Sequence, residues 1–252
     1  MLLTIVADYG VGDLAFAEVR QRFAGLLPEA DVAAIPVPPF DTVSAGFCVA
    51  QLAFGAGPAD RVIYANVAPR QDEDAAREDN AGERLVAARL GSGVLVVGVA
   101  AGASLSFLAG AGVELRAVEV SDKGSQFRSR DVFPGAVAAL ARGVDGLLGE
   151  PVAVAPAPDR SVVYTDGYGN LKTTWYDAPA ESGTTLRVRI GGTTAEVMVS
   201  DGVFTVPAGT ISFAPGSSGW GGRACYELFA RGGNAAELFG RPAAGTPVEV
   251  VA

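Results

Sequence analysis

Residues 2–26, LLTIVADYGVGDLAFAEVRQRFAGL, contain the two patterns that decide the fold class. Leu3 to Ala7 is a short apolar run with branched side chains, which predicts a buried strand. After a glycine-containing turn, apolar side chains recur at helical spacing, at Phe16, Val19, Phe23 and Leu26. A strand followed by a helix that packs against it is the repeating unit of an α/β sheet.

The same alternation continues to about residue 150. Strands are predicted at 32–37, 62–67, 85–90, 94–99 and 114–120, and helices after Asp41-Thr42 and over 131–142. The turn Gly91-Ser92-Gly93 predicts a hairpin, and the charged stretch 71–84 predicts an exposed loop. We therefore predict an N-terminal α/β domain, residues 1–150, around a central, mostly parallel sheet.

Beyond this region the helical pattern disappears. Residues 151–160 contain three prolines and predict a linker. Strand-like runs follow at 162–165, 186–190, 196–199, 203–206 and 248–251, with a hairpin turn at Gly191-Gly192 and one short helix near 235–239. A smaller all-β domain, a barrel or a sandwich, is predicted over 161–252.

The composition narrows the class of partner. The net charge of −9 repels phosphate backbones and anionic lipid surfaces, so neither nucleic acid nor a membrane is an expected partner. The longest apolar run, about 94–108, is interrupted by glycine and serine and is shorter than the ~20 residues that a membrane helix needs. No basic leader precedes Asp8, and Cys48 and Cys225 lie in apolar stretches typical of buried thiols, so a cytoplasmic protein is expected.

The chain contains no histidine. That absence removes Ser-His-Asp and Cys-His catalysis and the usual zinc sites, and no metal or cofactor is expected. It favours a reaction with a good leaving group, in which positioning and electrostatics matter more than proton transfer.

Two candidate ligand sites lie in the predicted α/β domain. Asp8-Tyr9-Gly10-Val11-Gly12-Asp13 follows the first strand, where such sheets bind ligands, and a carboxylate there can accept both hydroxyls of a ribose. The alternative is that Asp8 or Asp13 caps the following helix. Phe127-Arg128-Ser129-Arg130-Asp131 precedes a predicted helix, so backbone N–H groups, a hydroxyl and guanidinium groups could bind an anion. The alternative is an ordinary capped helix start with solvated arginines.

Two more candidates lie in the predicted all-β domain. In Asp166-Gly167-Tyr168-Gly169-Asn170, Asp166 could bind an ammonium group and Asn170 the edge of a base. An ordinary Asp/Asn/Gly turn is the alternative. The stretch Ser217–Arg223 is rich in glycine and serine and carries one tryptophan and one arginine, suited to a carboxylate or a stacked ring. An irregular surface loop is the competing interpretation.

In this order the four segments resemble the hallmarks of the S-adenosyl-L-methionine hydroxide adenosyltransferase family, which includes the fluorinases and chlorinases. Those hallmarks are Asp-Phe-Gly near the N-terminus, Phe-His-Gly-Arg-Asp before a helix, Asp-x-Phe-Gly-Asn opening the second domain, and a final Asn-Ser-x-Gly-Tyr-Leu-Glu. Here they correspond to Asp8-Tyr9-Gly10, 127–131, 166–170 and 221–227. The resemblance runs over nearly the whole chain. It implies an α/β domain and a C-terminal β-barrel domain, in a homotrimer with sites between neighbouring subunits.

The resemblance also implies roles for the binding residues. Asp8 would hold the ribose hydroxyls, Asp166 the methionine ammonium, Asn170 the adenine and Arg223 the methionine carboxylate. Tyr9, Phe127 and Tyr168 would belong to the same binding site.

The reacting positions differ from those of the hydroxide-transferring members. Their Val-Asp-Pro-Gly corresponds to Val67-Ala68-Pro69-Arg70, their histidine corresponds to Arg128, and only Arg70 or Arg77 lies near their arginine. Ser129 matches the halogenase branch, which carries Phe-Tyr-Ser-Arg at this point. The predicted catalytic residues are therefore Ser129, Arg128 and Arg70.

Two functions are compatible with this sequence. The first is cleavage of S-adenosyl-L-methionine by nucleophilic substitution at ribose C5′, giving L-methionine and either adenosine or a 5′-substituted adenosine. The second is a catalytically inactive relative that binds S-adenosyl-L-methionine or adenosine as a sensor or scaffold.

Overall fold

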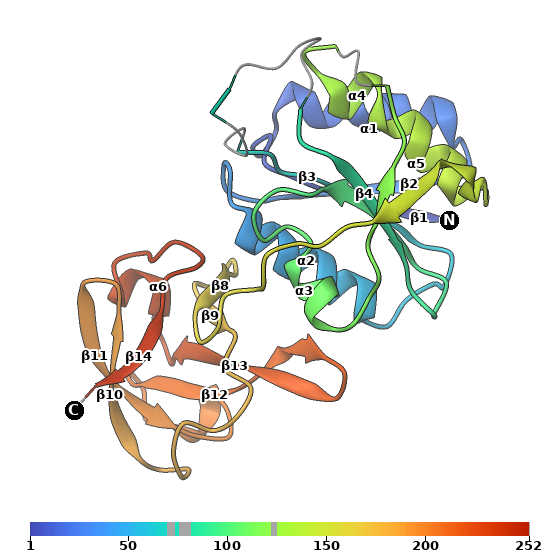
Figure 1. Cartoon of the computed structure of the whole chain (residues 1–252). Helices are drawn as coiled ribbons and strands as arrows, with labels where there is room; N and C mark the ends of the chain where they lie inside the picture. The colour runs from blue at the N-terminus through green and yellow to red at the C-terminus, as the bar shows by residue number, and fades with distance from the viewer. Residues whose placement is uncertain (70–73, 76–81, 122–124, 252) are drawn as a thin grey trace. The chain divides into compact units, whose positions relative to one another are not determined.

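The computed structural model describes residues 1–69, 74–75, 82–121 and 125–251. The chain divides into two compact units, Met1–Ala157 and Pro158–Ala252 (Figure 1). Residues 152–157, at the end of the first unit, form neither helix nor strand. Each unit contains a sheet of seven strands within the described ranges.

The first unit is built on a mixed sheet with the strand order β2-β1-β3-β5-β4-β6-β7. Its strands are β1 (Leu2–Ala7), β2 (Asp31–Pro36), β3 (Val62–Asn66), β4 (Leu85–Arg89), β5 (Leu95–Val99), β6 (Arg116–Val118) and β7 (Leu148–Pro151). The neighbours β2, β1, β3 and β5 pair in parallel, and β4, β6 and β7 extend the sheet with antiparallel pairs. The predicted mostly parallel sheet and the predicted β4–β5 hairpin are confirmed.

Helices cover both faces of this sheet. They are α1 (Leu14–Leu26), α2 (Thr42–Phe54), α3 (Ser106–Gly110), α4 (Arg128–Asp131) and α5 (Phe133–Ala141), followed by a 3-10 turn, η2 (Asp145–Leu147). In Figure 1, α1, α4 and α5 lie on one face of the sheet, and α2 and α3 lie on the other. This three-layer arrangement is the α/β architecture that the sequence predicts.

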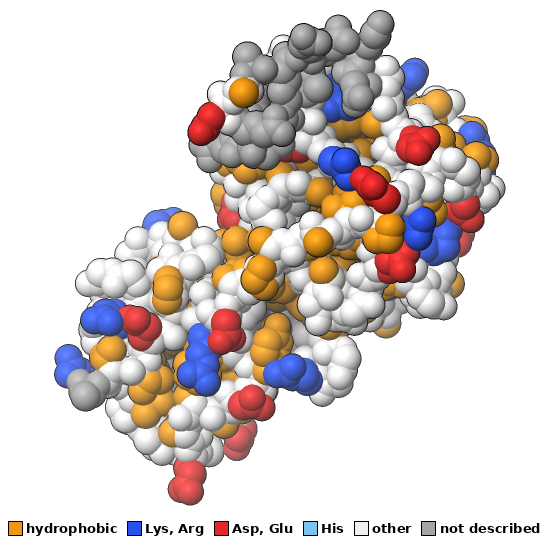
Figure 2. Space-filling view, in the orientation of Figure 1, with side chains coloured by type: hydrophobic (Ala, Val, Ile, Leu, Met, Phe, Trp, Pro, Cys, Tyr) orange, Lys and Arg blue, Asp and Glu red, His pale blue; other side chains and the backbone are white. Residues whose placement is uncertain are grey.

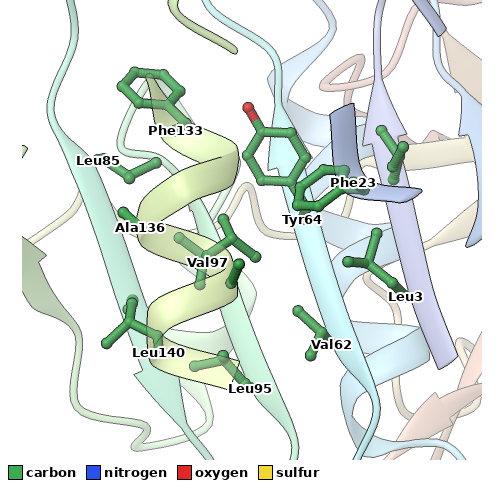
Figure 3. Packing of buried hydrophobic residues seen from close by; sticks show 14 of the residues in the cluster. Leu3, Phe23, Val62, Tyr64, Leu85, Leu95, Val97, Phe133, Ala136 and Leu140 are labelled. Atoms are coloured by element: carbon green, nitrogen blue, oxygen red, sulfur yellow. The ribbon is translucent and has the colours of Figure 1, made fainter. Parts of the chain in front are cut away.

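Alternate strand residues pack against α1 and α5, because successive side chains along a strand point to opposite faces. Figure 3 shows Leu3, Tyr64 and Val97 of three neighbouring strands beside Phe23 of α1 and Leu140 of α5, all buried. The rings of Phe23 and Tyr64 meet edge to face, with 5.3 Å between their centroids. Burial of this apolar surface is the main stabilising contribution to the unit.

On the opposite face, α2 approaches the segment before α3 very closely. A Cβ atom at Gly46 of α2 would lie 2.2 Å from the carbonyl oxygen of Ala103. The close approach brings the rings of Phe47 and Phe107 to a centroid distance of 6.2 Å. Only glycine at position 46 allows this packing.

The second unit is a curled sheet with the strand order β14-β10-β11-β12-β13-β9-β8. Its elements are β8 (Val162–Thr165), β9 (Leu171–Thr173), β10 (Thr185–Ile190), β11 (Thr193–Val199), η3 (Val203–Thr205), β12 (Ile211–Trp220), β13 (Arg223–Ala230), α6 (Ala235–Leu238) and β14 (Val248–Val251). Ser161 and Pro247, beside the two outermost strands, form an isolated bridge that brings the ends of the sheet together. The predicted all-β domain is confirmed, in the form of a half-barrel.

The predicted elements are confirmed only in part. The helix predicted over 131–142 is itself present as α5, Phe133–Ala141, and a separate short helix before it, α4, ends at Asp131. The run 203–206 forms the turn η3 instead of a strand, and Phe204 is 83% exposed, so its apolar pattern does not mark a buried face. The strand β12 is absent from the prediction because Pro215 and Gly219 interrupt its pattern, and the pairing register of β12 with β13 shifts between these two residues. Most of the predicted loop at 71–84 lies outside the described residues.

The surface carries charges of both signs. On the face drawn in Figure 2, Lys and Arg side chains lie beside Asp and Glu side chains in several places. Arg84 pairs with Glu150 at 2.9 Å and Arg189 with Glu249 at 2.7 Å, and all four side chains are half exposed or more. Exposed pairs of this kind contribute little to stability. Among the described helices, none has both the length and the apolar character that crossing a membrane requires.

A buried arginine closes the carboxyl end of α2. The Arg61 side chain donates four hydrogen bonds to backbone carbonyl oxygens, those of Leu52, Ala53, Gly55 and Pro58, at 2.6–3.0 Å. The last carbonyl groups of a helix have no partner within the helix and carry its negative dipole end. The guanidinium therefore neutralises and satisfies this helix end at the start of β3.

We expect Arg61→Met to lower the free energy of unfolding by about 2–3 kcal/mol, because several buried carbonyl groups lose a charged donor. The matched control is Arg189→Met, which removes one exposed ion pair and should cost less than about 1 kcal/mol. Urea denaturation of the three proteins measures both values. Equal effects of the two substitutions would show that Arg61 does not cap α2.

Candidate functional site

Asp8 follows β1 directly and lies at the carboxyl end of the parallel strands. Its Oδ2 atom accepts the backbone N–H of Phe40 at 2.9 Å. Phe40 has φ of 61°, a left-handed conformation that is strained for a side-chain-bearing residue. Asp8 thus ties the turn after β2 to the end of β1. Asp13, not Asp8, is the N-cap of α1, since it accepts the N–H of Ala15 at 2.8 Å.

Ser129 of α4 lies where β1, β3 and α4 meet. The Tyr9 hydroxyl donates to Ser129 Oγ at 2.8 Å, and the Tyr64 hydroxyl donates to the Ser129 carbonyl oxygen at 2.9 Å. The Tyr9 ring also packs edge to face on Phe16 and Phe127, at centroid distances of 5.0 and 5.9 Å. Two of the predicted site segments, distant in sequence, are therefore in direct contact.

Burial fixes the protonation state of this cluster. It raises the pKa of Tyr9 well above the ordinary value, although hydrogen bonds with Ser129 and Asn66 lower it. The pKa of the buried Tyr64 is also raised, first by burial. Both tyrosines are neutral hydrogen-bond donors near neutral pH. Because Ser129 Oγ already accepts from Tyr9, its own O–H is available to donate to another acceptor.

The two arginines beside Ser129 point to different partners. Arg128 reaches the Ser121 carbonyl oxygen at 3.3 Å and lies over the Phe133 ring at 4.9 Å, and its Nε is buried without a hydrogen-bond partner in the described part of the chain. Arg130 donates to Asp131 at 2.7 Å and to Glu18 at 3.1 Å.

The segment that contains these arginines is predicted to precede a helix. It forms α4 itself, and the N–H groups of Arg130 and Asp131 are already bonded to the Phe127 carbonyl oxygen. Consequently the backbone amides of Arg130 and Asp131 are not free to bind an anion. Arg70, the third predicted catalytic residue, lies outside the described residues.

The stretch Asp166–Asn170 forms a tight turn between β8 and β9. The Gly169 N–H donates to the Asp166 carbonyl oxygen at 2.9 Å. Asp166 Oδ1 accepts the N–H groups of Tyr168 and Asn170 at 2.9 and 3.0 Å, and its Oδ2 accepts the Asn170 side-chain Nδ2 at 2.9 Å. The turn is thus organised around the Asp166 carboxylate, while the Tyr168 ring is 83% exposed.

Helix α6 and its N-cap residue contact this turn directly. The Ala236 N–H donates to the Gly169 carbonyl oxygen at 2.9 Å. Gly169 has φ of +80°, and a Cβ atom there would lie 2.0 Å from Oδ1 of Asn234, which caps α6. Both the backbone conformation and the space require glycine.

A buried ion pair lies next to the same turn. Lys172 of β9 donates to Glu227 of β13 at 2.9 Å, and its Nζ is 3.9 Å from Asp166 Oδ2. The Glu227 side chain is 1% exposed and also accepts the Ser218 N–H at 3.3 Å. One cation therefore lies between two carboxylates.

Arg223 begins β13 after the turn Gly221-Gly222, and the residues before that turn, 217–220, are the end of β12, so the predicted surface loop is the end of a β-hairpin. The Arg223 guanidinium lies over the Tyr176 ring at 4.3 Å. Burial raises the pKa of Tyr176 to about 12, so the ring is neutral. A guanidinium held flat on a ring keeps its N–H edge available for a carboxylate.

The fold is shared by solved proteins. The crystal structure of an uncharacterized conserved protein from Thermotoga maritima matches with a TM-score of 0.78 at 18% sequence identity, covering 99% of this chain and 100% of that chain. A conserved hypothetical protein from Thermus thermophilus matches with a TM-score of 0.69 at 27% identity, covering 99% of each chain. No family model and no curated protein matches this chain. The two likenesses establish a fold shared over the full length.

Three residues that complete these clusters are not predicted from the sequence: Tyr64, Lys172 and Asn234. Tyr64 falls inside a predicted strand, where a tyrosine among aliphatic residues signals a hydroxyl that needs a partner. Lys172 lies two residues after the Asp166–Asn170 turn, but its partner Glu227 is 55 residues away. Asn234, which packs against Gly169, gives no signal beyond its capping position before the predicted short helix.

We expect Gly169→Ala to lower the free energy of unfolding by about 2–4 kcal/mol, because the new Cβ meets Asn234 and the left-handed backbone is strained. Gly167→Ala in the same turn is the control: a Cβ at Gly167 has no neighbour within 4 Å, and the cost should stay below about 1 kcal/mol. Thermal unfolding of both variants measures the difference. Equal costs would mean that the turn is not held as described.

Asp131 should give the protein part of its acid sensitivity. Hydrogen bonds from Arg130 and then from Ser125 lower the pKa of Asp131 from 3.8 to about 2. A carboxylate with a lowered pKa stabilises the fold above about pH 4, and this contribution is lost as the pH falls towards 2. Asp131→Asn should therefore lose less stability between pH 4 and 2 than the wild type, measured by denaturation at each pH. Parallel pH profiles would contradict the assignment.

Proposed function

We propose that this protein binds S-adenosyl-L-methionine and cleaves it by nucleophilic substitution at ribose C5′. The nucleophile forms a bond to C5′, and the bond from C5′ to sulfur breaks. The sulfonium takes the electron pair of that bond and leaves as the neutral thioether of L-methionine. Water as nucleophile gives adenosine and a proton, and a small anion gives a 5′-substituted adenosine.

The observation that carries this proposal is the meeting of Tyr9 and Ser129. The 2.8 Å hydrogen bond joins two sequence segments that are 120 residues apart, and both belong to the resemblance with the adenosyltransferase family. Both residues also depart from the pattern of its hydroxide-transferring members, which carry phenylalanine and glycine at these positions. The two residues that differ from this pattern form a hydrogen bond with each other, and this supports the proposal that they belong to one functional site.

The reaction does not require the protein to protonate the leaving group, because methionine leaves as a neutral molecule from a sulfonium cation. Asp8, at the end of β1, has one carboxylate oxygen engaged with Phe40 and can accept ribose hydroxyls with the other. Ser129 can donate its O–H to an incoming nucleophile. Positioning and desolvation of the nucleophile would then supply the rate acceleration.

A second candidate function is binding without cleavage, as a sensor or scaffold. It is favoured by two observations: Tyr9 and Tyr64, which bond to Ser129, are neutral donors, and Ala68 stands where the hydroxide-transferring relatives carry a carboxylate. None of these three can accept a proton from water. A halide or another anion as nucleophile would not need such a base.

We expect the purified protein to convert S-adenosyl-L-methionine to L-methionine and adenosine, or to a 5′-chloro product when chloride is present, as measured by chromatography. Tight adenosine binding without any product would select the sensor or scaffold function. Neither binding nor product would contradict both functions. Sedimentation velocity on the same preparation tests the predicted homotrimer.

We expect Asp8→Asn to weaken nucleoside binding at least tenfold, because the amide retains an acceptor for Phe40 but loses the charged acceptor for the ribose hydroxyls. The control is Asp31→Asn. Asp31 is exposed and is the first residue of β2, so it lies at the opposite end of the parallel strands from Asp8. Calorimetric titration with adenosine compares the two variants. Equal affinities would place the ribose elsewhere.

A further inference from the structure

The carboxylate of Asp166 is already engaged by its own turn. Its Oδ1 accepts two backbone N–H groups, and its Oδ2 accepts Asn170 Nδ2 and lies 3.9 Å from the Lys172 ammonium. A carboxylate offers about four acceptor positions, and three of them accept hydrogen bonds from within the turn, while the Lys172 ammonium lies beside Oδ2. The side chain is also only 22% exposed. Little capacity is left for a ligand ammonium group.

The same hydrogen bond fixes which way the Asn170 carboxamide faces. A carboxylate accepts hydrogen bonds and cannot donate them, so the amide NH₂ of Asn170, and not its oxygen, must face Asp166. Asn170 Oδ1 accepts no hydrogen bond from the described residues. The turn therefore offers an acceptor oxygen, and next to it the second N–H of the same amide.

Lys172 and Glu227 place a cation beside the Asp166 carboxylate. Glu227 is almost fully buried and takes the Lys172 ammonium at 2.9 Å, and β13 pairs with β9 at these two residues. This pairing fixes the cation next to Asp166 Oδ2.

We propose that Asp166 is a positioning residue that fixes the Asn170 amide as an acceptor for the 6-amino group of a purine, and that it does not bind the ligand's ammonium. This proposal rests on the proposed function, because it assumes that a nucleoside is the ligand. The 6-amino group of adenine donates to Asn170 Oδ1, and N7 of adenine suits the remaining amide N–H. The 6-oxo group of hypoxanthine would meet Oδ1 as a second acceptor.

Asp166→Asn tests this proposal with little change of shape. Oδ1 of the new amide can still accept the N–H groups of Tyr168 and Asn170, so its NH₂ replaces Oδ2. The Asn170 amide must then turn over to present its oxygen to that NH₂, and its own NH₂ faces the ligand. The binding preference should move from adenosine towards inosine.

The measurement is calorimetric titration of adenosine, inosine and S-adenosyl-L-methionine into wild type, Asp166→Asn and the control Asp177→Asn, an exposed site in the same unit. We expect the wild type to prefer adenosine over inosine by about tenfold or more. Asp166→Asn should lower that ratio about tenfold and weaken adenosine and S-adenosyl-L-methionine equally. The control should match the wild type.

Two results would overturn the proposal. If Asp166→Asn weakens S-adenosyl-L-methionine but leaves adenosine and the adenosine-to-inosine ratio unchanged, the carboxylate holds the ammonium. If Asp166→Asn changes neither the affinity for S-adenosyl-L-methionine nor that ratio, Asp166 does not position the amide.

A ligand-free measurement separates this proposal from the proposed function. The Asn170 side-chain amide is assigned in ¹⁵N spectra of the wild type as the signal that is absent from Asn170→Ser. One of its two protons should be shifted relative to those of solvent-exposed side-chain amides and protected from exchange with water. An unprotected amide contradicts the positioning role even if nucleosides bind. Failure of every nucleoside to bind, with a protected amide, contradicts the proposed function alone.

Discussion

The parallel pairing of β1 with β2 and β3 is the constraint on which the first unit depends. Its register aligns Ala7 with Pro36 on one side and with Asn66 on the other. The segments that follow these three strands therefore all begin at the same end of the sheet, the carboxyl end of the strands. Asp8 can therefore reach the turn at Phe40, and Tyr9 can reach Ser129. A shift of one residue in the β1 register would turn Leu3 and Ile5 away from α1 and separate these contacts.

The elements that can be predicted from the sequence are those whose signals are local. Asp13 and Asp41 cap helices that begin one residue later, and Gly191-Gly192 closes a hairpin between adjacent strands. The contacts that build the candidate sites are not local. Tyr64 bonds a residue 65 positions later, and Lys172 pairs with one 55 positions later. The residues next to Tyr64 and Lys172 in the sequence do not indicate these partners, so the contacts can be identified only from the folded structure.

The structure changes how the residues that carry the resemblance are understood. The resemblance makes Asp8 and Asp166 ligand carboxylates, and each proves to hold a turn as well: Asp8 bonds the strained Phe40, and Asp166 organises its own loop. A side chain that shapes a loop can persist in a sequence whether or not it touches a ligand. Ser129 differs, because its bond to Tyr9 leaves the serine O–H free to donate.

The central claim of the proposed function is that the protein binds the adenosyl group of S-adenosyl-L-methionine. A crystal structure of the protein soaked with adenosine tests it most directly. The account predicts a nucleoside whose ribose hydroxyls lie within hydrogen-bond distance of Asp8 and whose 6-amino group lies within that distance of Asn170 Oδ1. Nucleoside density that contacts neither residue would contradict it.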